Sequence, residues 1–200
     1  GSGQVGAHVV GVARERGHEA IVLTRGTGVD LVAGTGVAEA LTGVDVVIDV
    51  ASVTTLDADE SIAFFSAITS TLLDAETAAG VRHHLALSIV GVDRAPWGYY
   101  AGKEAQERLI ERGDVPWTIL RATQFHEFTE QIYERATIGP LHVAPKMRTQ
   151  PIAAREVAEH LVSLAEAGPA GRVRDLGGPR EERLVDMVRG LARRRGSRAW

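Results

Sequence analysis

Short apolar runs alternate along the chain with longer segments in which apolar residues recur at helical spacing. Strands are predicted at 20–24, 44–50, 84–88, 117–121 and 173–176, and helices at 4–16, 34–43, 59–79, 99–111, 125–136, 153–167 and 183–194. Segments that alternate in this way form βαβ units, so the pattern predicts an α/β fold with a mainly parallel sheet. The run 44–50 is nearly continuously apolar, as expected of a strand that helices cover on both faces.

The size and composition of the chain fit one globular domain, 1–200. Of its 200 residues, 44% are hydrophobic and 24% are charged, and no apolar run reaches the roughly 18 residues that span a membrane. The formal charge of −4 argues against a general nucleic-acid-binding role. Cysteine is absent, which excludes disulfides and thiol catalysis and fits a reducing compartment. We therefore expect a cytoplasmic protein that binds neither nucleic acid nor membranes.

A glycine-rich sequence opens the chain. Gly1, Gly3 and Gly6, with Gln4 and Val5 between them, spell G-x-G-x-x-G and lead directly into the first predicted helix. Glycine lets the backbone approach a pyrophosphate closely, and the helix N-terminus offers unpaired N–H groups to it. The sequence therefore indicates a dinucleotide-binding loop. A Gly-Ser start can equally be the remnant of an expression tag, and the glycines alone do not decide between the two.

The residues about 20 positions after the glycines indicate which dinucleotide binds. An acid there accepts a hydrogen bond from the ribose 2′-hydroxyl of NAD, whereas an arginine pairs with the 2′-phosphate of NADP. The chain has Thr24 and Arg25 at this place, which favours NADP(H) over NAD(H). An exposed loop arginine is the alternative. Asp30 would support NAD only if its loop folded back.

A Y-x-x-x-K pair, Tyr99 and Lys103, lies in the predicted helix 99–111, where this spacing places both residues on one face. A nearby cation stabilises the phenolate and is expected to lower the tyrosine pKa toward neutrality. Ser88 ends the strand 84–88 at a carboxyl end, where open α/β sheets bind their ligands. A helix-surface pair is the alternative for Tyr99 and Lys103 alone. The ordered set of glycine loop, Ser88, Tyr99 and Lys103 predicts a catalytic site.

Three segments, 87–93, 115–125 and 150–158, add to this set. Together with the Tyr99 to Lys103 motif, their order and spacing resemble the short-chain dehydrogenase/reductase superfamily, and more closely its atypical, NmrA-like branch of NAD(P)H-binding proteins. The resemblance covers nearly the whole chain. It implies a Rossmann-type, doubly wound, mainly parallel sheet with helices on both faces, a bound NADP(H), and Ser88, Tyr99 and Lys103 as counterparts of the family's catalytic residues.

The resemblance also implies where cofactor and substrate bind. The implied cofactor site comprises Gly1, Gly3, Gln4, Val5, Gly6, Thr24, Arg25, Val50, Ala51, Ser52, Lys103, Ala122 and Thr123. Substrate contacts are expected from Trp97, Phe125 and His126, next to a small substrate-side portion at about 122–200. Packing under a loop is the alternative for Trp97, and a solvent-facing position is the alternative for His126. In the family, the glycine loop follows the first strand of the sheet. This sequence begins at the loop itself, so we expect that the residues of that first strand are missing from it.

Metal binding and assembly follow less directly from the residues. No metal site is predicted, because cysteine is absent and the histidines are scattered. The helix 59–79 is of the kind that forms a dimer seam in many short-chain reductases, so a monomer or a homodimer is expected.

These patterns lead to one main hypothesis. The chain is expected to be an NADP(H)-dependent oxidoreductase of the atypical short-chain type that transfers a hydride to or from a small carbonyl or quinone-like substrate. Tyr99 would protonate the oxygen, Lys103 would lower the tyrosine pKa and hold the nicotinamide ribose, and Ser88 would orient the carbonyl. The alternatives are an NADP(H)-binding sensor without turnover, and a sugar-nucleotide epimerase or dehydratase, which usually needs a larger C-terminal lobe.

Overall fold

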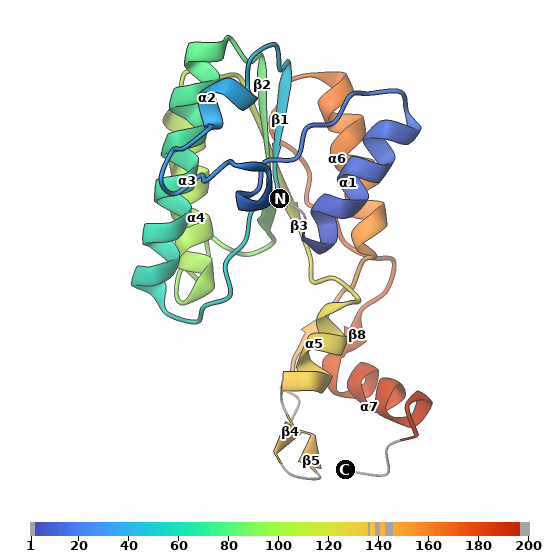
Figure 1. The fold of residues 1–200 in the computed structure, drawn as a ribbon. Coiled ribbons are helices and arrows are strands. Elements are labelled where there is room, and N and C mark those ends of the chain that lie inside the picture. Colours follow the sequence, from blue (N-terminus) through green and yellow to red (C-terminus); the bar gives the residue numbers. More distant parts are fainter. Residues whose placement is uncertain (1–2, 136, 139–140, 143–145, 197–200) are drawn as a thin grey trace.

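The computed structural model describes residues 3–135, 137–138, 141–142 and 146–196. Its elements are α1 (Gln4–Glu15), a 3₁₀ helix (Arg25–Thr27), α2 (Val37–Ala40), β1 (Val46–Asp49), α3 (Ala58–Ala79), β2 (His83–Ile89), α4 (Tyr99–Arg112), β3 (Trp117–Ala122), α5 (Phe128–Arg135), β4 (Thr137–Ile138), β5 (Leu141–His142), β6 (Arg148–Thr149), α6 (Ala154–Ala167), β7 (Gly171–Arg172), β8 (Glu182–Arg183) and α7 (Leu184–Arg194). Three layers result, with α3 and α4 on one face of the sheet and α1 and α6 on the other (Figure 1).

The sheet has the strand order β1-β2-β3-β7, and all its pairs are parallel. Adjacent residues of a strand face opposite layers. Leu85 and Leu120 therefore pack with α1 and α6, whereas Ala86 and Ile119 pack with Ile110 of α4. The expected α/β architecture, a Rossmann-like parallel sheet covered on both faces, is confirmed. The predicted helices are confirmed as well, apart from the start of α5 and the extent of the helix predicted at 34–43, of which only α2, Val37–Ala40, is helical.

Helices α3 and α4 cross closely at Gly102. A Cβ added to Gly102 would overlap the backbone and side chain of Ser61, so only glycine fits at this crossing. The Ser61 hydroxyl also donates a hydrogen bond to the carbonyl oxygen of Tyr99, at 2.9 Å. These two contacts fix the first turn of α4 against α3.

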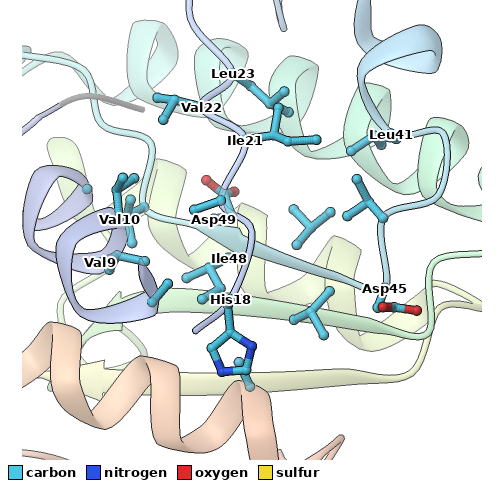
Figure 2. Close-up of a pocket in the computed structure, with 18 of the residues that line it drawn as sticks. Val9, Val10, His18, Ile21, Val22, Leu23, Leu41, Asp45, Ile48 and Asp49 are labelled. Carbon is cyan, nitrogen blue, oxygen red and sulfur yellow. The ribbon is translucent and has the colours of Figure 1, made fainter. Parts of the chain in front are cut away.

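The predicted strand at 20–24 is wrong. The segment is extended but forms no ladder, because none of the described strands lies between it and β1. A cavity of about 520 Å³ occupies this place, lined by apolar side chains of α1, β1 and the segment itself, among them Val9, Val22 and Ile48 (Figure 2). A strand needs a partner for its N–H and C=O groups, and no described strand pairs with this segment.

Two other expected elements differ in extent. Helix α5 begins at Phe128, later than predicted, because the backbone at Phe125 and His126 pairs with Ile152. Residue 136, where the predicted helix ends, lies outside the described residues. The predicted strand at 173–176 is displaced, since β7 is already complete at Arg172 and Leu176 rejoins the sheet through one isolated bridge to Ala122.

The elements after β3, apart from α6 and β7, form a small unit below the sheet (Figure 1). Helix α7 packs on α5, and β6 pairs with β8 in antiparallel fashion. Arg195 pairs with Glu130 and Glu134 and lies over the ring of Tyr133. In the part of the chain that the structure describes, no helix is long and apolar enough to cross a membrane.

Candidate functional site

The candidate site lies where the parallel strands end. Asp49 ends β1, Ser88 is the last but one residue of β2, and Ala122 ends β3. Open α/β sheets bind ligands outside these carboxyl ends. The side chain of Ala122 is buried, and the Thr123 hydroxyl donates to the carbonyl oxygen of Gln150 at 2.5 Å. The residues after β3 and the segment before α6 therefore lie side by side and border this edge of the sheet.

Helix α1 begins beside this edge with an uncapped N-terminus. Gly3 is the N-cap residue, no side chain caps the first turn, and no acidic residue lies in it. Gly3 and Gln4 are exposed, whereas Val5 and Gly6 are buried, so the latter two could contact a ligand only through their backbone. Unpaired N–H groups and the positive end of the helix dipole suit a pyrophosphate. Gly1, the first residue of the expected loop, lies outside the described residues.

Thr24 and Arg25 form a turn after the extended segment. The hydroxyl of Thr24 accepts from the N–H of Thr27, and the hydroxyl of Thr27 accepts from the N–H of Thr24, at 3.2 and 3.0 Å. Arg25, in this 3₁₀ helix, is exposed. One carboxylate oxygen of Asp30 accepts from two N–H groups of its own turn. Arg25 and Asp30 are the two residues that could contact the adenosine ribose. Asp30 already accepts hydrogen bonds within its own turn, whereas Arg25 is exposed to solvent.

Tyr99 stands at the first position of α4. Its ring packs edge-on against Phe65, with centroids 5.5 Å apart, and its hydroxyl lies 2.9 Å from the hydroxyl of Ser52. Burial raises the pKa of Tyr99 above its usual value; the hydrogen bond to Ser52 opposes this effect and the charge of Asp49 adds to it. The expected lowering of this pKa by Lys103 is therefore wrong for the free protein. Tyr99 is protonated at neutral pH.

Lys103 points into the protein. Lys103 is only 3% exposed. Its Nζ donates to the carbonyl oxygen of Leu87 at 2.6 Å and to Oε1 of Gln106, and the same Nζ lies 4.7 Å from the ring centroid of Phe65. Burial lowers the pKa of Lys103 to about 8, against the opposing charges of Asp49 and Glu107. The helix places Tyr99 and Lys103 on the same side, as predicted, and both contact Phe65. No hydrogen bond joins the two.

Ser88 is brought to the same edge without meeting Tyr99. It is 3% exposed and lies opposite Arg121 in the strand register. Its buried hydroxyl forms no hydrogen bond of good geometry among the described residues, but it lies close enough to Glu107 to help lower the pKa of that carboxyl. The hydroxyl that does contact Tyr99 belongs to Ser52, which was expected only as a cofactor neighbour. The structure thus brings Ser88, Tyr99 and Lys103 to one end of the sheet without a hydrogen bond between them: Tyr99 is paired with Ser52, a residue from outside this set, and Lys103 with Leu87 and Gln106.

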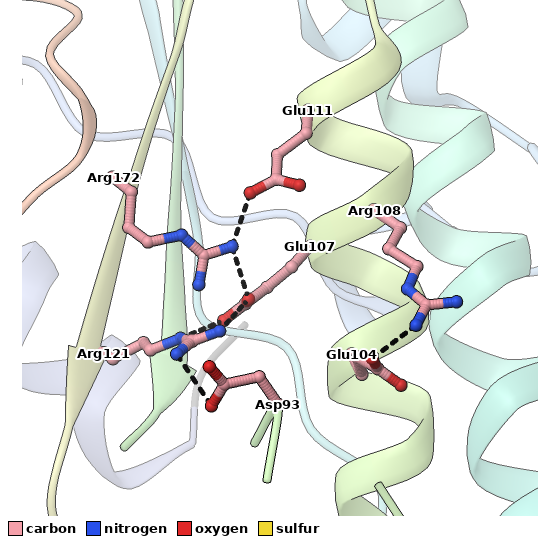
Figure 3. Close-up of polar contacts among 7 residues, drawn as sticks. All are labelled: Asp93, Glu104, Glu107, Arg108, Glu111, Arg121 and Arg172. Atoms are coloured by element: carbon pink, nitrogen blue, oxygen red, sulfur yellow. Dashed lines mark hydrogen bonds and ion pairs between the residues drawn. The ribbon is translucent and has the colours of Figure 1, made fainter. Parts of the chain in front are cut away.

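A cluster of charged residues fastens α4 to the sheet next to Ser88 (Figure 3). Arg121 of β3 is 7% exposed and donates to both carboxylate oxygens of Glu107, at 2.9 and 2.7 Å. It also lies 3.1 Å from Asp93, while Arg172 pairs with Glu107 and Glu111. Burial is the largest single effect and would raise the pKa of Glu107. The hydrogen bonds from Arg121 and Ser88, together with the charges of Arg121 and Arg172, outweigh it and hold the pKa below its usual value.

The expected substrate residues differ in exposure and surroundings. Trp97 is 71% exposed, so it does not pack under its loop. The neighbouring Gly98 closely approaches the carbonyl oxygen of Leu56, and this contact joins the loop after β1 to the loop before α4. His126 is exposed and Phe125 is half-buried against the core. The exposed side chains of Trp97 and Leu56 thus belong to two loops that meet just before Tyr99 in the chain.

Sequence reasoning missed two buried polar residues of the site, Asp49 and Gln106. Gln106 donates to Oδ2 of Asp49 at 2.6 Å, and Oδ1 of Asp49 accepts from the N–H of Ala51 at 2.8 Å. An acid inside the apolar run 44–50, and a glutamine three residues after Lys103 on the same helix, were the signals that could have pointed to them.

Comparison with known proteins adds an independent result. A family described as NAD(P)H-binding matches residues 27–167. No curated protein sequence matches the chain significantly. Among solved structures, the UDP-glucose 4-epimerase of Thermotoga maritima, with UDP-glucose, shares 15% sequence identity at a TM-score of 0.76, and the alignment covers 100% of this chain and 82% of that one.

Two other solved structures have the same fold. The NAD-dependent NDP-hexosamine 5,6-dehydratase TunA of tunicamycin biosynthesis shares 17% identity at a TM-score of 0.77, over 100% of this chain and 80% of that one. A short-chain dehydrogenase/reductase superfamily protein of Agrobacterium tumefaciens with bound NAD shares 20% identity at a TM-score of 0.73, over 98% and 82%. At these identities the likeness is one of fold.

Proposed function

Because the chain belongs to the NAD(P)H-binding family, we propose that it is a cytoplasmic, NADP(H)-dependent oxidoreductase of the atypical short-chain type. Its substrate is a small carbonyl or quinone-like compound. The observation that carries the proposal is the position of Tyr99: a protonated phenol beside Ser52, at the carboxyl end of the sheet and one helical turn from the buried cation Lys103. A general acid at this edge is what carbonyl reduction requires.

The described residues fit a dinucleotide. The uncapped first turn of α1 would hold the pyrophosphate, and the exposed Arg25 would pair with the 2′-phosphate. The backbone from Val50 to Ser52 is close enough to the strand end to line the nicotinamide side. When bound, NADPH supplies the hydride that reduces the carbonyl carbon.

The chain's own residues supply the proton and the orientation. Tyr99 donates its hydroxyl proton to the carbonyl oxygen, so that the carbonyl gains one hydride and one proton and becomes an alcohol. Lys103, charged below its pKa of about 8, favours the phenolate that is left on Tyr99. Ser88 is proposed to orient the carbonyl. The exposed Trp97 would contact the apolar part of the substrate.

Turnover of a substrate panel tests this proposal. NADPH oxidation should be detected with at least one class among quinones, aldehydes and ketones, and the reduced product should appear in equal amount. NADPH binding without oxidation across the panel would contradict the proposal. UDP-glucose is included, because conversion of this compound alone would favour the epimerase reading.

A second candidate function is an NADP(H)-binding sensor without turnover. Two observations favour it: the donors of Lys103 are directed toward Leu87 and Gln106, and the hydroxyl of Ser88 is not bonded to Tyr99. Such a protein binds NADPH with the same residues, so binding alone does not separate the two functions. The substrate panel does.

Replacing Arg25 with alanine should weaken NADPH binding by about tenfold or more and leave NADH binding unchanged, because only NADPH carries the 2′-phosphate. The expected loss corresponds to a hydrogen-bonded charge pair. Calorimetric titration of both dinucleotides measures it. The matched control is Arg82→Ala, at the opposite end of the sheet, where the arginine pairs with the exposed Asp45. Equal affinities of the original protein for NADPH and NADH would refute the role of Arg25.

A further inference from the structure

We propose that Asp49 and Gln106 are positioning residues for the pair of Tyr99 and Lys103, with Asp49 acting as the remote counter-charge of Lys103 through the amide of Gln106. This inference rests on the proposed function, because it concerns the same pair. It adds two residues that the motifs of the chain do not contain, and it assigns a chemical task to each.

The first observation is a continuous buried path between two opposite charges. Lys103 donates to Oε1 of Gln106, and Nε2 of Gln106 donates to Oδ2 of Asp49 at 2.6 Å. The three side chains are 3%, 1% and 4% exposed. No direct ion pair joins Lys103 and Asp49. The amide therefore spans the gap between the ammonium and the carboxylate.

The chemistry of the two ends fixes the direction of the amide. An ammonium can only donate and a carboxylate can only accept, so Gln106 must turn its oxygen to Lys103 and its nitrogen to Asp49. In this direction the negative end of the amide dipole faces the ammonium of Lys103 and its positive end faces the carboxylate of Asp49, so the dipole stabilises both charged forms. A buried ammonium without such compensation would lose its proton easily, because burial disfavours the charged form.

A second branch leads from Asp49 to Tyr99. Oδ1 of Asp49 accepts from the N–H of Ala51 and so holds the turn that follows β1. The next residue of this turn is Ser52, whose hydroxyl lies 2.9 Å from that of Tyr99. One carboxylate thus holds the turn that carries Ser52 with Oδ1 and accepts from Gln106, the partner of Lys103, with Oδ2.

The groups around Lys103 show why Asp49 matters for its charge. The acting charges are Asp49 from β1 and Glu107 from α4 itself, while β2 contributes the carbonyl of Leu87 and α3 the ring of Phe65. Both carboxylates raise the pKa of Lys103 against burial. Asp49 also raises the pKa of Tyr99, so its loss should lower both values.

A purely structural role would consist of satisfying buried polar groups. It predicts lower stability after any substitution, but no particular direction of the Lys103 titration. The counter-charge role predicts opposite signs for two substitutions. Asp49→Asn removes a negative charge and should lower the pKa of Lys103, whereas Gln106→Glu adds one in direct contact and should raise it.

The titration can be observed directly, because the chain has only two lysines, Lys103 and Lys146. In protein labelled with ¹³C at lysine Cε, each lysine gives one NMR signal whose shift follows its ionisation, and Lys146→Arg assigns them. Asp49→Asn should lower the Lys103 midpoint by about one pH unit or more, and Gln106→Glu should move it upward. The matched control is Asp45→Asn, an exposed carboxylate just before β1, which should leave it unchanged.

An unchanged Lys103 midpoint in folded Asp49→Asn protein would overturn the inference, and so would shifts of the same sign in Asp49→Asn and Gln106→Glu. If Asp49→Asn does not fold, Gln106→Met decides, because it keeps Asp49 but removes the amide that links it to Lys103: the Lys103 midpoint should fall, and an unchanged midpoint would overturn the inference. Thermal unfolding of each variant shows whether it is folded over the titrated range. The titration needs neither cofactor nor substrate, so its failure is distinct from a failure of the proposed reaction, which the substrate panel detects.

Discussion

Replacing Tyr99 with phenylalanine should reduce NADPH-dependent turnover by at least about 100-fold, the usual contribution of a positioned general acid. Only the hydroxyl is lost. The ring contact with Phe65 is retained, and the lost hydrogen bond to Ser52 is partly exposed, so the free energy of unfolding should fall by about 1 kcal/mol or less. NADPH affinity should change little. The measurements are steady-state kinetics with the substrate identified in the panel, calorimetric NADPH titration and thermal unfolding.

The neighbouring tyrosine provides the control. Tyr100→Phe removes the same atom from the next residue of α4, whose hydroxyl lies 3.5 Å from Nε2 of Gln124, and should leave the rate within about twofold. Unchanged turnover in Tyr99→Phe protein would refute the role of Tyr99. Equal losses in both variants would show that packing at the start of α4, and not the proton of Tyr99, limits the rate.

Helical spacing and strand composition predicted the main elements, because these signals are local. Both α3 and α4 follow from apolar periodicity, and β2 and β3 from short apolar runs. The segment 20–24 carries the same strand signal but remains unpaired. Its state depends on a neighbouring strand, and pairing is a property of the whole sheet that no local pattern contains.

The candidate site was predictable in its helical part and less so elsewhere. The i, i+4 spacing places Tyr99 and Lys103 on one side of α4, but the direction of the lysine depends on Gln106 and on the carbonyl of Leu87. Ser52 meets Tyr99 because Asp49 holds the turn after β1. The contacts of Ser52 with Tyr99 and of Gln106 with Asp49 join residues 47 and 57 positions apart, a distance over which single-sequence motifs do not encode pairing.

The charge cluster of Glu107 and Arg121 explains how α4 keeps its place on the sheet. Arg121 extends from β3 and donates two parallel hydrogen bonds to Glu107, which is the geometry that holds a carboxylate in both position and orientation (Figure 3). The same arginine reaches Asp93 in the loop that leads to Trp97. One side chain therefore couples the sheet, the helix that carries Tyr99 and the loop that leads to Trp97.

Replacing Glu107 with alanine should lower the free energy of unfolding by roughly 3–5 kcal/mol at neutral pH, because it leaves Arg121 buried without its main partner. Urea unfolding followed by circular dichroism measures the loss. The control on the same helix is Glu104→Ala, whose i, i+4 pair with the exposed Arg108 should contribute less than about 0.5 kcal/mol. Similar losses in both variants would contradict the special role of Glu107.

The pH dependence of this loss has a definite sign. The folded pKa of Glu107 lies below that of the unfolded chain, so the ionised carboxylate stabilises the fold above the ordinary glutamate value of 4.5. The stability difference between the original protein and Glu107→Gln should therefore shrink as the pH falls below about 4.5. The double variant Glu107→Leu/Arg121→Met should recover much of the stability lost in Glu107→Ala, because it removes both buried charges together. A double variant as unstable as the single one would show that the hydrogen bonds themselves, and not an unpaired charge, account for the loss.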